Sequence, residues 1–194
     1  YDLSGNLLKT TDAEGKSVSY TYDSNYNKTS STDANGNTTW YTYTGNMKQN
    51  IVALPDGNTI EYVYDSEDRA IKVIDQNGKA TTTEYDDAGR IISVQDTDKN
   101  SVYYEYDAVG NVLKETGKTG AKTAKTYDAN GNVLTVTDNN GNITSYLYDS
   151  MNRVVKVTDA LSGITTYTYN NAGDLLSSAN ALGYTVSYTY DAYG

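Results

Sequence analysis

The sequence contains no cysteine, no histidine and no phenylalanine among its 194 residues, and it has one proline and one tryptophan. Without cysteine there is no disulfide, no thiol nucleophile and no zinc–thiolate site, so the redox compartment is left open. No run of apolar residues approaches the ~20 that a membrane-spanning helix needs. We therefore expect no direct insertion into a membrane.

Positive charge is also scarce. Lys and Arg number 15 against 25 Asp and Glu, which gives a net charge of −10. This balance argues against nucleic-acid binding, because neutralising phosphates requires clustered Lys and Arg. The same charge is unfavourable at an anionic membrane surface. We expect the acidity to serve solubility.

Tyrosine, in contrast, occurs 21 times, and Gly, Asn, Asp and Thr are frequent. This composition favours turns and half-wet pleated surfaces over a thick dry core. Tyr in place of Phe has a physical meaning, because its ring packs while its hydroxyl needs water or a partner. We expect a face built from Tyr that packs while its hydroxyls stay wet.

The tyrosines mark a strict internal repeat of 21 residues, a feature sought before any other because it decides the architecture. The first Tyr of each unit is usually followed by Asp, and a second Tyr usually lies two residues earlier. Nine complete units and a partial unit at 190–194 form a single array over residues 1–194. The complete units begin at Tyr1, Tyr22, Tyr43, Tyr64, Tyr85, Tyr106, Tyr127, Tyr148 and Tyr169, and the partial unit begins at Tyr190.

Two turn signals divide each unit into two short strands. One follows Tyr-Asp, as at 106–111, and the other lies mid-unit, as at 138–142, where Asn-Gly tolerates the positive φ of a tight turn. The segments between them, such as 133–137 and 143–148, have strand-like composition, and no stretch carries a helical period. We predict an all-β fold of tandem β-hairpins.

The number of strands predicts curvature. An open sheet with two strands from every unit would be abnormal, because twisted sheets seldom pass ~10 strands without curling or splitting. We therefore predict a long curled or spiralling antiparallel sheet. A parallel β-solenoid with one turn per 21 residues is the alternative, but two turn signals per unit favour hairpins.

The unit Tyr-Asp-x-x-Gly-Asn-(Val/Leu)-(Leu/Ile)-x-x-x-Asp-x-x-Gly-x-x-x-x-Tyr-x resembles the YD repeat of the RHS family, most clearly at 1–21, 85–105 and 127–147. The resemblance implies hairpins that wind into part of a hollow shell or barrel, as in bacterial RHS polymorphic toxins, insecticidal toxin complexes and teneurins. It also implies a fragment of a large secreted or cell-surface protein. The RHS-core segment that closes many toxin shells has no counterpart here, so an enclosed cargo is implied by the resemblance alone.

Two functions follow from this resemblance. The first is a non-catalytic structural shell or scaffold segment, whose partners are the remainder of its own parent chain and an enclosed or displayed effector domain, such as a toxin. The second is an extracellular adhesion or cell-contact module, or a fibre, that binds glycan or protein. The organism, the ligand and the oligomeric state do not follow from this segment.

The recurring aspartates invite two chemical interpretations. Paired carboxylates catalyse many hydrolytic reactions, but these residues recur at the turns, where bonds to nearby backbone N–H groups explain them. Loops such as 33–37 offer hard oxygen ligands for calcium, yet neither the calcium-repeat pattern nor a complete EF-hand loop is present. We expect no enzyme, no catalytic residue, no metal site and no cofactor, with structural calcium at the turns as the alternative.

Trp40 and Tyr103 occupy one repeat position that normally holds Ser or Thr, on the face opposite the main Tyr rows. Exposed aromatic rings can stack on sugars, and they can equally form a packing pair or a contact with another part of the parent protein. These two residues are the predicted ligand or partner contacts.

Three units depart from the pattern. The second has Lys28 where others have an aliphatic residue, and the third has Thr44-Gly45-Asn46, which we interpret as a shortened first turn. Pro55 cannot donate to a strand ladder and therefore belongs in a turn or at a bulge. The sixth unit is rich in Lys and Gly over 114–125, which predicts a solvated, irregular hairpin.

Overall fold

The computed structural model describes residues 1–191, and the chain divides into two compact units, Tyr1–Ser101 and Val102–Gly194. The described residues contain 18 β-strands and no helix, so the predicted all-β fold is confirmed. The partial unit at 190–194 lies outside the described residues from position 192 onward. A single array over the whole chain stays a prediction.

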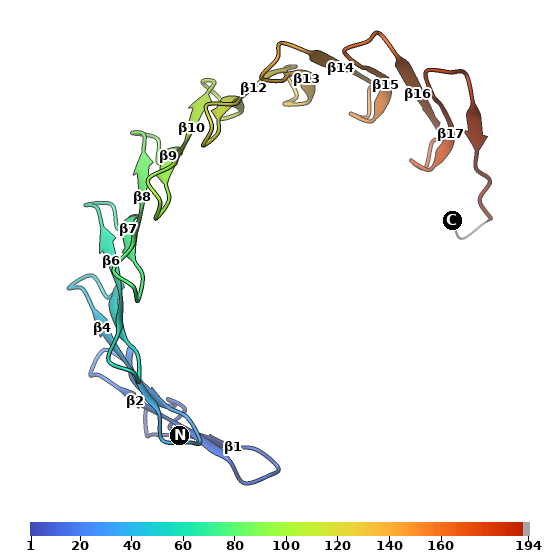
Figure 1. The fold of residues 1–194 in the computed structure, drawn as a ribbon. Helices are drawn as coiled ribbons and strands as arrows, with labels where there is room; N and C mark the ends of the chain where they lie inside the picture. The colour runs from blue at the N-terminus through green and yellow to red at the C-terminus, as the bar shows by residue number, and fades with distance from the viewer. Residues whose placement is uncertain (192–194) are drawn as a thin grey trace. The chain divides into compact units, whose positions relative to one another are not determined.

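The first compact unit is an antiparallel meander in which each strand pairs with the next one along the chain (Figure 1). Its strands are β1 (Lys9–Thr11), β2 (Ser17–Tyr22), β3 (Lys28–Thr32), β4 (Thr38–Tyr43), β5 (Gln49–Ala53), β6 (Thr59–Tyr64), β7 (Ala70–Ile74), β8 (Ala80–Tyr85) and β9 (Ile91–Gln95).

The second compact unit repeats this meander. Its strands are β10 (Ser101–Tyr106), β11 (Val112–Thr116), β12 (Lys122–Tyr127), β13 (Val133–Thr137), β14 (Ile143–Tyr148), β15 (Val154–Thr158), β16 (Ile164–Tyr169), β17 (Leu175–Ala179) and β18 (Thr185–Ser187). Because each strand pairs with its neighbours in sequence, tandem antiparallel hairpins are confirmed, and the parallel solenoid is excluded.

Every even-numbered strand from β2 to β16 meets the following odd-numbered strand through a β-bulge. Tyr22 pairs with Lys28 while Thr21 pairs with Ser30, so Thr29 is the extra residue. An extra residue locally disrupts the ladder and bends the strand. Each repeat therefore carries one interruption in its backbone bonding, at a constant place.

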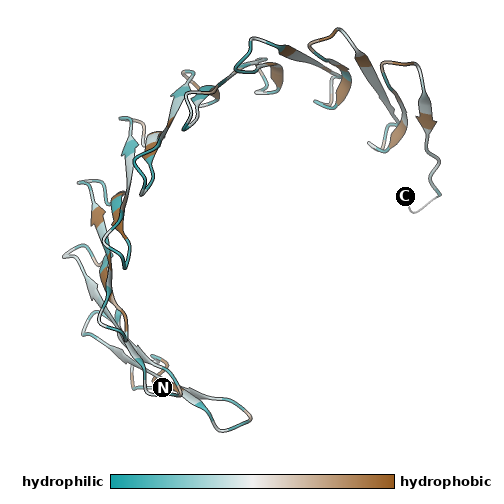
Figure 2. Ribbon diagram, viewed as in Figure 1, coloured by the Kyte–Doolittle hydropathy of each residue, from teal (hydrophilic) through white to brown (hydrophobic). Residues whose placement is uncertain are grey.

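The sheet in each compact unit is a single layer. Val52 is the one apolar side chain classed as buried among the described residues, and the paired Tyr residues of β4, Tyr41 and Tyr43, are half-buried. Hydrophobic residues lie in short stretches of the strands, whereas hydrophilic residues dominate the turns of the first unit (Figure 2). Stability must therefore come from contacts between neighbouring strands and turns rather than from a core between two layers.

The sheet of each unit is open. The predicted curl into part of a shell stays a prediction. No helix in residues 1–191 is long and apolar enough to cross a membrane.

Two expectations about irregular units are wrong. Thr44 opens a full five-residue turn, because its N–H donates to the carbonyl of Lys48 at 2.8 Å, and Met47 occupies the glycine position. The Lys- and Gly-rich sixth unit forms regular strands β11 and β12 around a turn of the same kind. Backbone hydrogen bonds define the geometry of this turn. Residues other than Asp and Gly can therefore occupy its first and fourth positions at a modest cost in stability. Pro55 lies in the turn between β5 and β6, as predicted.

Candidate functional site

The repeated tyrosines form one hydrogen bond per repeat to the backbone. The hydroxyl of Tyr43, at the end of β4, donates to the carbonyl of Lys28 at 2.8 Å. Lys28 pairs with Tyr22 and directly precedes the extra residue of the bulge, Thr29. The same bond, always to a carbonyl fifteen residues earlier, is made by Tyr22, Tyr64, Tyr85, Tyr127, Tyr148, Tyr169 and Tyr190 at 2.7–3.1 Å.

For these tyrosines, the bonds overturn the expectation that the hydroxyls stay exposed to water; for the Tyr two residues earlier it stays a prediction. The bulge interrupts the ladder, and the Tyr hydroxyl of the next repeat supplies a donor to a carbonyl at that place. A phenylalanine would fill the same space but would leave this carbonyl without that donor. The sequence carried a signal for the bulge, because two adjacent aliphatic residues, as at 133–134 and 154–155, break the strand alternation.

The aspartates organise the turns. In the turn 33–37, the N–H of Gly36 donates to the carbonyl of Asp33 at 3.0 Å. The Asp33 carboxylate accepts the N–H groups of Asn35 and Asn37, each at 2.9 Å. The side-chain amide of Asn37 donates to the other carboxylate oxygen at 2.9 Å, and this bond is the main cause that lowers the pKa of Asp33 from its ordinary value. The carboxylate of Asp33 therefore serves as an acceptor for its own turn.

Neighbouring repeats also contact each other where an Arg replaces Asn at the fifth position of a turn. The Nε of Arg69 donates to the carboxylate of Asp65 at 2.7 Å, within its own turn. Its guanidinium carbon lies 4.8 Å from the centre of the Tyr85 ring, and Nη1 donates to the carbonyl of Asp86 at 3.4 Å. Arg153 repeats the arrangement in the second compact unit, 4.7 Å from the Tyr169 ring. The sequence analysis did not predict a role for these arginines, although both stand at the fifth turn position, where other repeats have Asn.

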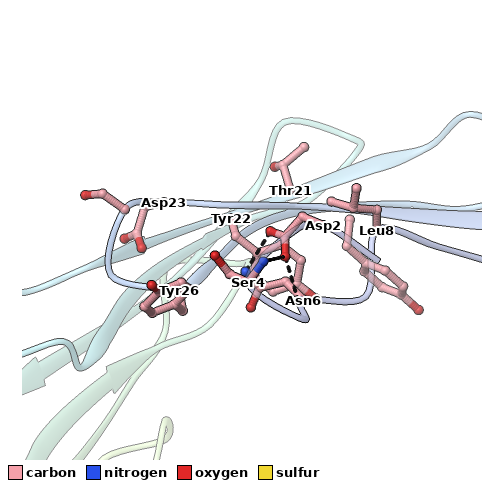
Figure 3. A pocket seen from close by; sticks show the side chains of 10 residues that line it. Asp2, Ser4, Asn6, Leu8, Thr21, Tyr22, Asp23 and Tyr26 are labelled. Atoms are coloured by element: carbon pink, nitrogen blue, oxygen red, sulfur yellow. Dashed lines mark hydrogen bonds between the residues drawn. The ribbon is translucent and has the colours of Figure 1, made fainter.

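The first compact unit has two hollows on its turn edge. The first, of about 450 Å³, lies between the first turns of two successive repeats and is lined by Asp2, Asn6, Tyr22 and Tyr26, among others (Figure 3). The second, of about 410 Å³, lies two repeats further on, beside Tyr64. Both are polar in character, because the turn side chains form most of their walls.

The two predicted contact residues, Trp40 and Tyr103, are exposed, as the alternation of side chains along the strands predicts. Trp40 on β4 is 56% exposed and Tyr103 on β10 is 52% exposed. Trp40 lies between Ser30 on β3 and Ala53 on β5 in the strand register, so its strand neighbours are small. The two residues belong to different compact units, and their role as ligand contacts stays a prediction.

The described residues contain no group of three or more His, Cys, Asp or Glu side chains placed to hold a metal ion. The turn carboxylates are spread along the edges of the sheet and accept bonds from their own turns, as Asp2 does from Ser4 and Asn6. A dispersed arrangement of this kind is typical of structural residues rather than of one catalytic cleft.

Comparison with known proteins connects this repeat to a family. The family model described as RHS Repeat matches residues 1–38, 64–101, 85–122 and 127–164. No curated protein matches the sequence at a significant level.

Solved structures share the fold. A crystal structure of TcdB2-TccC3-Cdc42 superposes with a TM-score of 0.58 at 19% identity, over 96% of this chain and 11% of that one. The Tc holotoxin pore of Photorhabdus luminescens superposes with a TM-score of 0.50 at 18% identity, over 89% of this chain and 9% of that one. The chain thus spans about a tenth of the length of these structures.

Proposed function

Because this chain belongs to the RHS repeat family, we propose that it is a non-catalytic wall segment of a large secreted or cell-surface protein, where it helps to enclose or display another domain. One observation carries this proposal. The two residues that define the repeat, Tyr and Asp, both bond to backbone groups, as Tyr22 and Asp23 do. The residues that define the repeat therefore have a structural role in this chain.

The local pairing of strands also supports a wall. Each strand pairs with its neighbours in sequence within its compact unit, so repeats can be added without changing those already present. The Tc complexes that share the fold are much longer chains, which is consistent with a wall built from many such segments. The enclosed domain, whether a toxin or another effector, is part of the proposal.

Protease protection in the full-length parent protein tests this function. If the array is a wall around a cargo, the cargo domain resists protease under native conditions and is digested once denaturant opens the wall. Electron microscopy of the same protein then shows density inside a closed wall. Digestion of the cargo at the same rate as the isolated cargo domain, together with an extended fibre in the images, would contradict the wall.

An adhesion module is the second candidate, favoured by the exposed rings of Trp40 and Tyr103. A contact module uses its outer surface, and aromatic rings are common anchors at such surfaces. A glycan array and a binding assay on cells with the Trp40→Ala and Tyr103→Ala variants test it, with Thr82→Ala as a control at the same repeat position. Binding that survives both aromatic substitutions removes this candidate.

A further inference from the structure

Two arginines of the chain, Arg69 and Arg153, show which groups the first turns of neighbouring repeats can bind. The guanidinium of Arg69 meets three kinds of group, namely a carboxylate, a tyrosine ring and a backbone carbonyl. Arg153 meets the same three kinds, with its Nη1 2.9 Å from the carbonyl of Asn170. Two independent copies of one arrangement indicate that the place between successive first turns is suited to a planar cation.

The first hollow occupies this same place, three repeats before Arg69. Here Asn6 stands at the arginine position, and its short side chain binds Asp2 without reaching the next repeat. The hollow is lined by the residues equivalent to those around Arg69. They are Asp2, Ser4, Tyr22, Asp23 and Tyr26, which correspond to Asp65, Glu67, Tyr85, Asp86 and Gly89.

The second hollow repeats the arrangement two repeats after the first. It is lined by Tyr64 and Asp65, whose counterparts in the first hollow are Tyr22 and Asp23, but Thr44 stands where the first hollow has Asp2. Asp68 adds a carboxylate at the wall, where it accepts a bond from Asn46 at 3.0 Å. Lys48 occupies the arginine position and is absent from the lining.

Three other pairs of repeats place their own side chains at the equivalent position. Arg69 and Arg153 do so with a guanidinium. In the second compact unit the Asn132 amide donates to Asn152 of the next turn at 2.7 Å, which bridges the two turns.

We propose that the two hollows of the first compact unit bind guanidinium groups of arginine side chains from a partner polypeptide. The first hollow offers the tyrosine ring and the turn carboxylate that the chain uses for its own arginines. The second offers a tyrosine ring together with the carboxylates of Asp65 and Asp68 at its wall. The net charge of −10 attracts such a cationic partner. The inference goes beyond the proposed wall function and does not depend on it.

A titration followed by NMR of backbone amides tests the chemistry. The probes are acetyl-arginine amide, acetyl-lysine amide and the neutral isostere acetyl-citrulline amide, each added to the full chain. We expect the arginine probe to shift the amides of Ser4, Tyr26, Asn46 and Asp68, with a dissociation constant on the order of 1 mM, and the citrulline probe to bind at least about tenfold more weakly. Equal shifts from arginine and citrulline would overturn the proposal, as would arginine shifts spread evenly over all acidic turns.

Two substitutions make the test specific to each hollow. Asn6→Arg should fill the first hollow as Arg69 fills its own place, so the response at Ser4 and Tyr26 is lost while that at Asn46 and Asp68 remains. Lys48→Arg should produce the reverse pattern. Asn37→Arg, in a turn on the other edge, is the matched control and should leave both responses intact. A full response at Ser4 and Tyr26 in the folded Asn6→Arg variant contradicts the proposed site.

Spacing separates a polypeptide partner from a small guanidinium compound. The hollows lie two repeats, or four strands, apart, which is roughly 19 Å at ~4.8 Å per strand. A peptide with two arginines about six residues apart in an extended chain spans this distance. It should bind at least about tenfold more tightly than a peptide with adjacent arginines, because the second contact becomes intramolecular. Equal affinity of the two peptides would exclude a partner that uses both hollows.

Discussion

At the scale of single residues, the tyrosine at the end of each even-numbered strand from β2 to β16 combines an apolar ring with a hydroxyl. In β6, Tyr64 donates to the carbonyl of Gln49 at 2.7 Å, whereas Tyr62, two residues earlier, pairs with Val73. The two tyrosines of a repeat therefore differ in role, although both are half-buried. The hydroxyl of Tyr64 bonds to the backbone, and we expect that of Tyr62 to be dispensable for stability.

We predict that Tyr64→Phe lowers the free energy of unfolding by about 0.5–1.5 kcal/mol, the usual net value of a hydrogen bond. Tyr62→Phe is the matched control, because it removes a hydroxyl from the same strand without removing a backbone bond, and it should change stability by less than about 0.5 kcal/mol. Urea denaturation followed by circular dichroism measures both. Equal losses would mean that the bond to Gln49 contributes nothing of its own.

At the scale of elements, the five-residue turn is the unit of construction. Its fourth residue adopts positive φ throughout, and non-glycine residues hold this place at Tyr26, Met47, Asp68, Lys99, Asn152 and Ser162. Some of these side chains gain a contact from this position, as Asp68 does with Asn46 and Asn152 with Asn132. The left-handed conformation is unfavourable for a residue with a Cβ, so a lateral contact can offset part of that cost.

Gly36→Ala should destabilise the chain by about 1 kcal/mol, because Gly36 has a φ of 84° and alanine is strained there. The space around Gly36 is open, so the cost is conformational rather than steric. Gly45→Ala is the control, since Gly45 has open space but no positive φ. It should be neutral or slightly stabilising. Thermal unfolding of the two variants distinguishes these effects, and an equal loss in both would refute the conformational explanation.

Acid should weaken the turns. The pKa of Asp33 and of Asp138 is lowered from the ordinary value of 3.8, in each case chiefly by the side-chain amide of Asn37 or Asn142. A carboxyl with a lowered pKa in the folded state stabilises the fold above the unfolded pKa, and this contribution is lost as pH falls through the folded value. The urea midpoint should therefore fall as pH decreases below about 4.

Asparagine provides the control for this pH dependence. Asn180 already opens a turn of the same kind, where its side-chain oxygen accepts from Leu182 and Tyr184, each at 3.0 Å. A variant with Asp33→Asn and Asp138→Asn should stay folded at pH 7 and lose less stability between pH 4 and pH 2.5 than the unaltered chain. The same acid loss in both proteins would show that other carboxyls govern the transition.

At the scale of the molecule, stability is distributed along the chain rather than concentrated in a core. Val52 is the sole apolar side chain classed as buried in residues 1–191, and strand contacts within each compact unit join sequence neighbours. In such an array the free energy of unfolding is approximately the sum of the stability of each repeat and the interactions between neighbouring repeats. Single repeats can therefore unfold locally. Folding should be helped by the short sequence separation of these contacts.

Hydrogen exchange should reflect this distribution. Amides in β4 and β6 should exchange at least roughly tenfold more slowly than those in β1, which corresponds to about 1.4 kcal/mol. The reason is that all three residues of β1 are exposed, whereas most residues of β4 and β6 are half-buried. Mass spectrometry of peptides after exchange measures the difference. Uniform protection from β1 to β6 would instead show one cooperative unit.

The sequence by itself determined the repeat, the hairpins and the face on which each tyrosine lies. These features depend on a constant period, on turn residues and on side-chain alternation, all of which are local. It also predicted that Trp40 lies on the face away from the tyrosine rows, and the exposed ring agrees. The regular turn at Thr44 was missed, because its backbone bonds matter more than the identity of the residue at Met47.

Only the tertiary structure decided what the repeated side chains bind. The bond of Tyr43 to Lys28 and the stacking of Arg69 on Tyr85 join residues fifteen and sixteen positions apart, and both depend on the strand register and on the bulge. A one-residue shift of register exchanges the faces of a strand, so pairing had to be known before partners could be named. Composition showed that tyrosine replaces phenylalanine, and the structure supplied the reason, a backbone carbonyl at the bulge that accepts a bond from the hydroxyl of the next repeat.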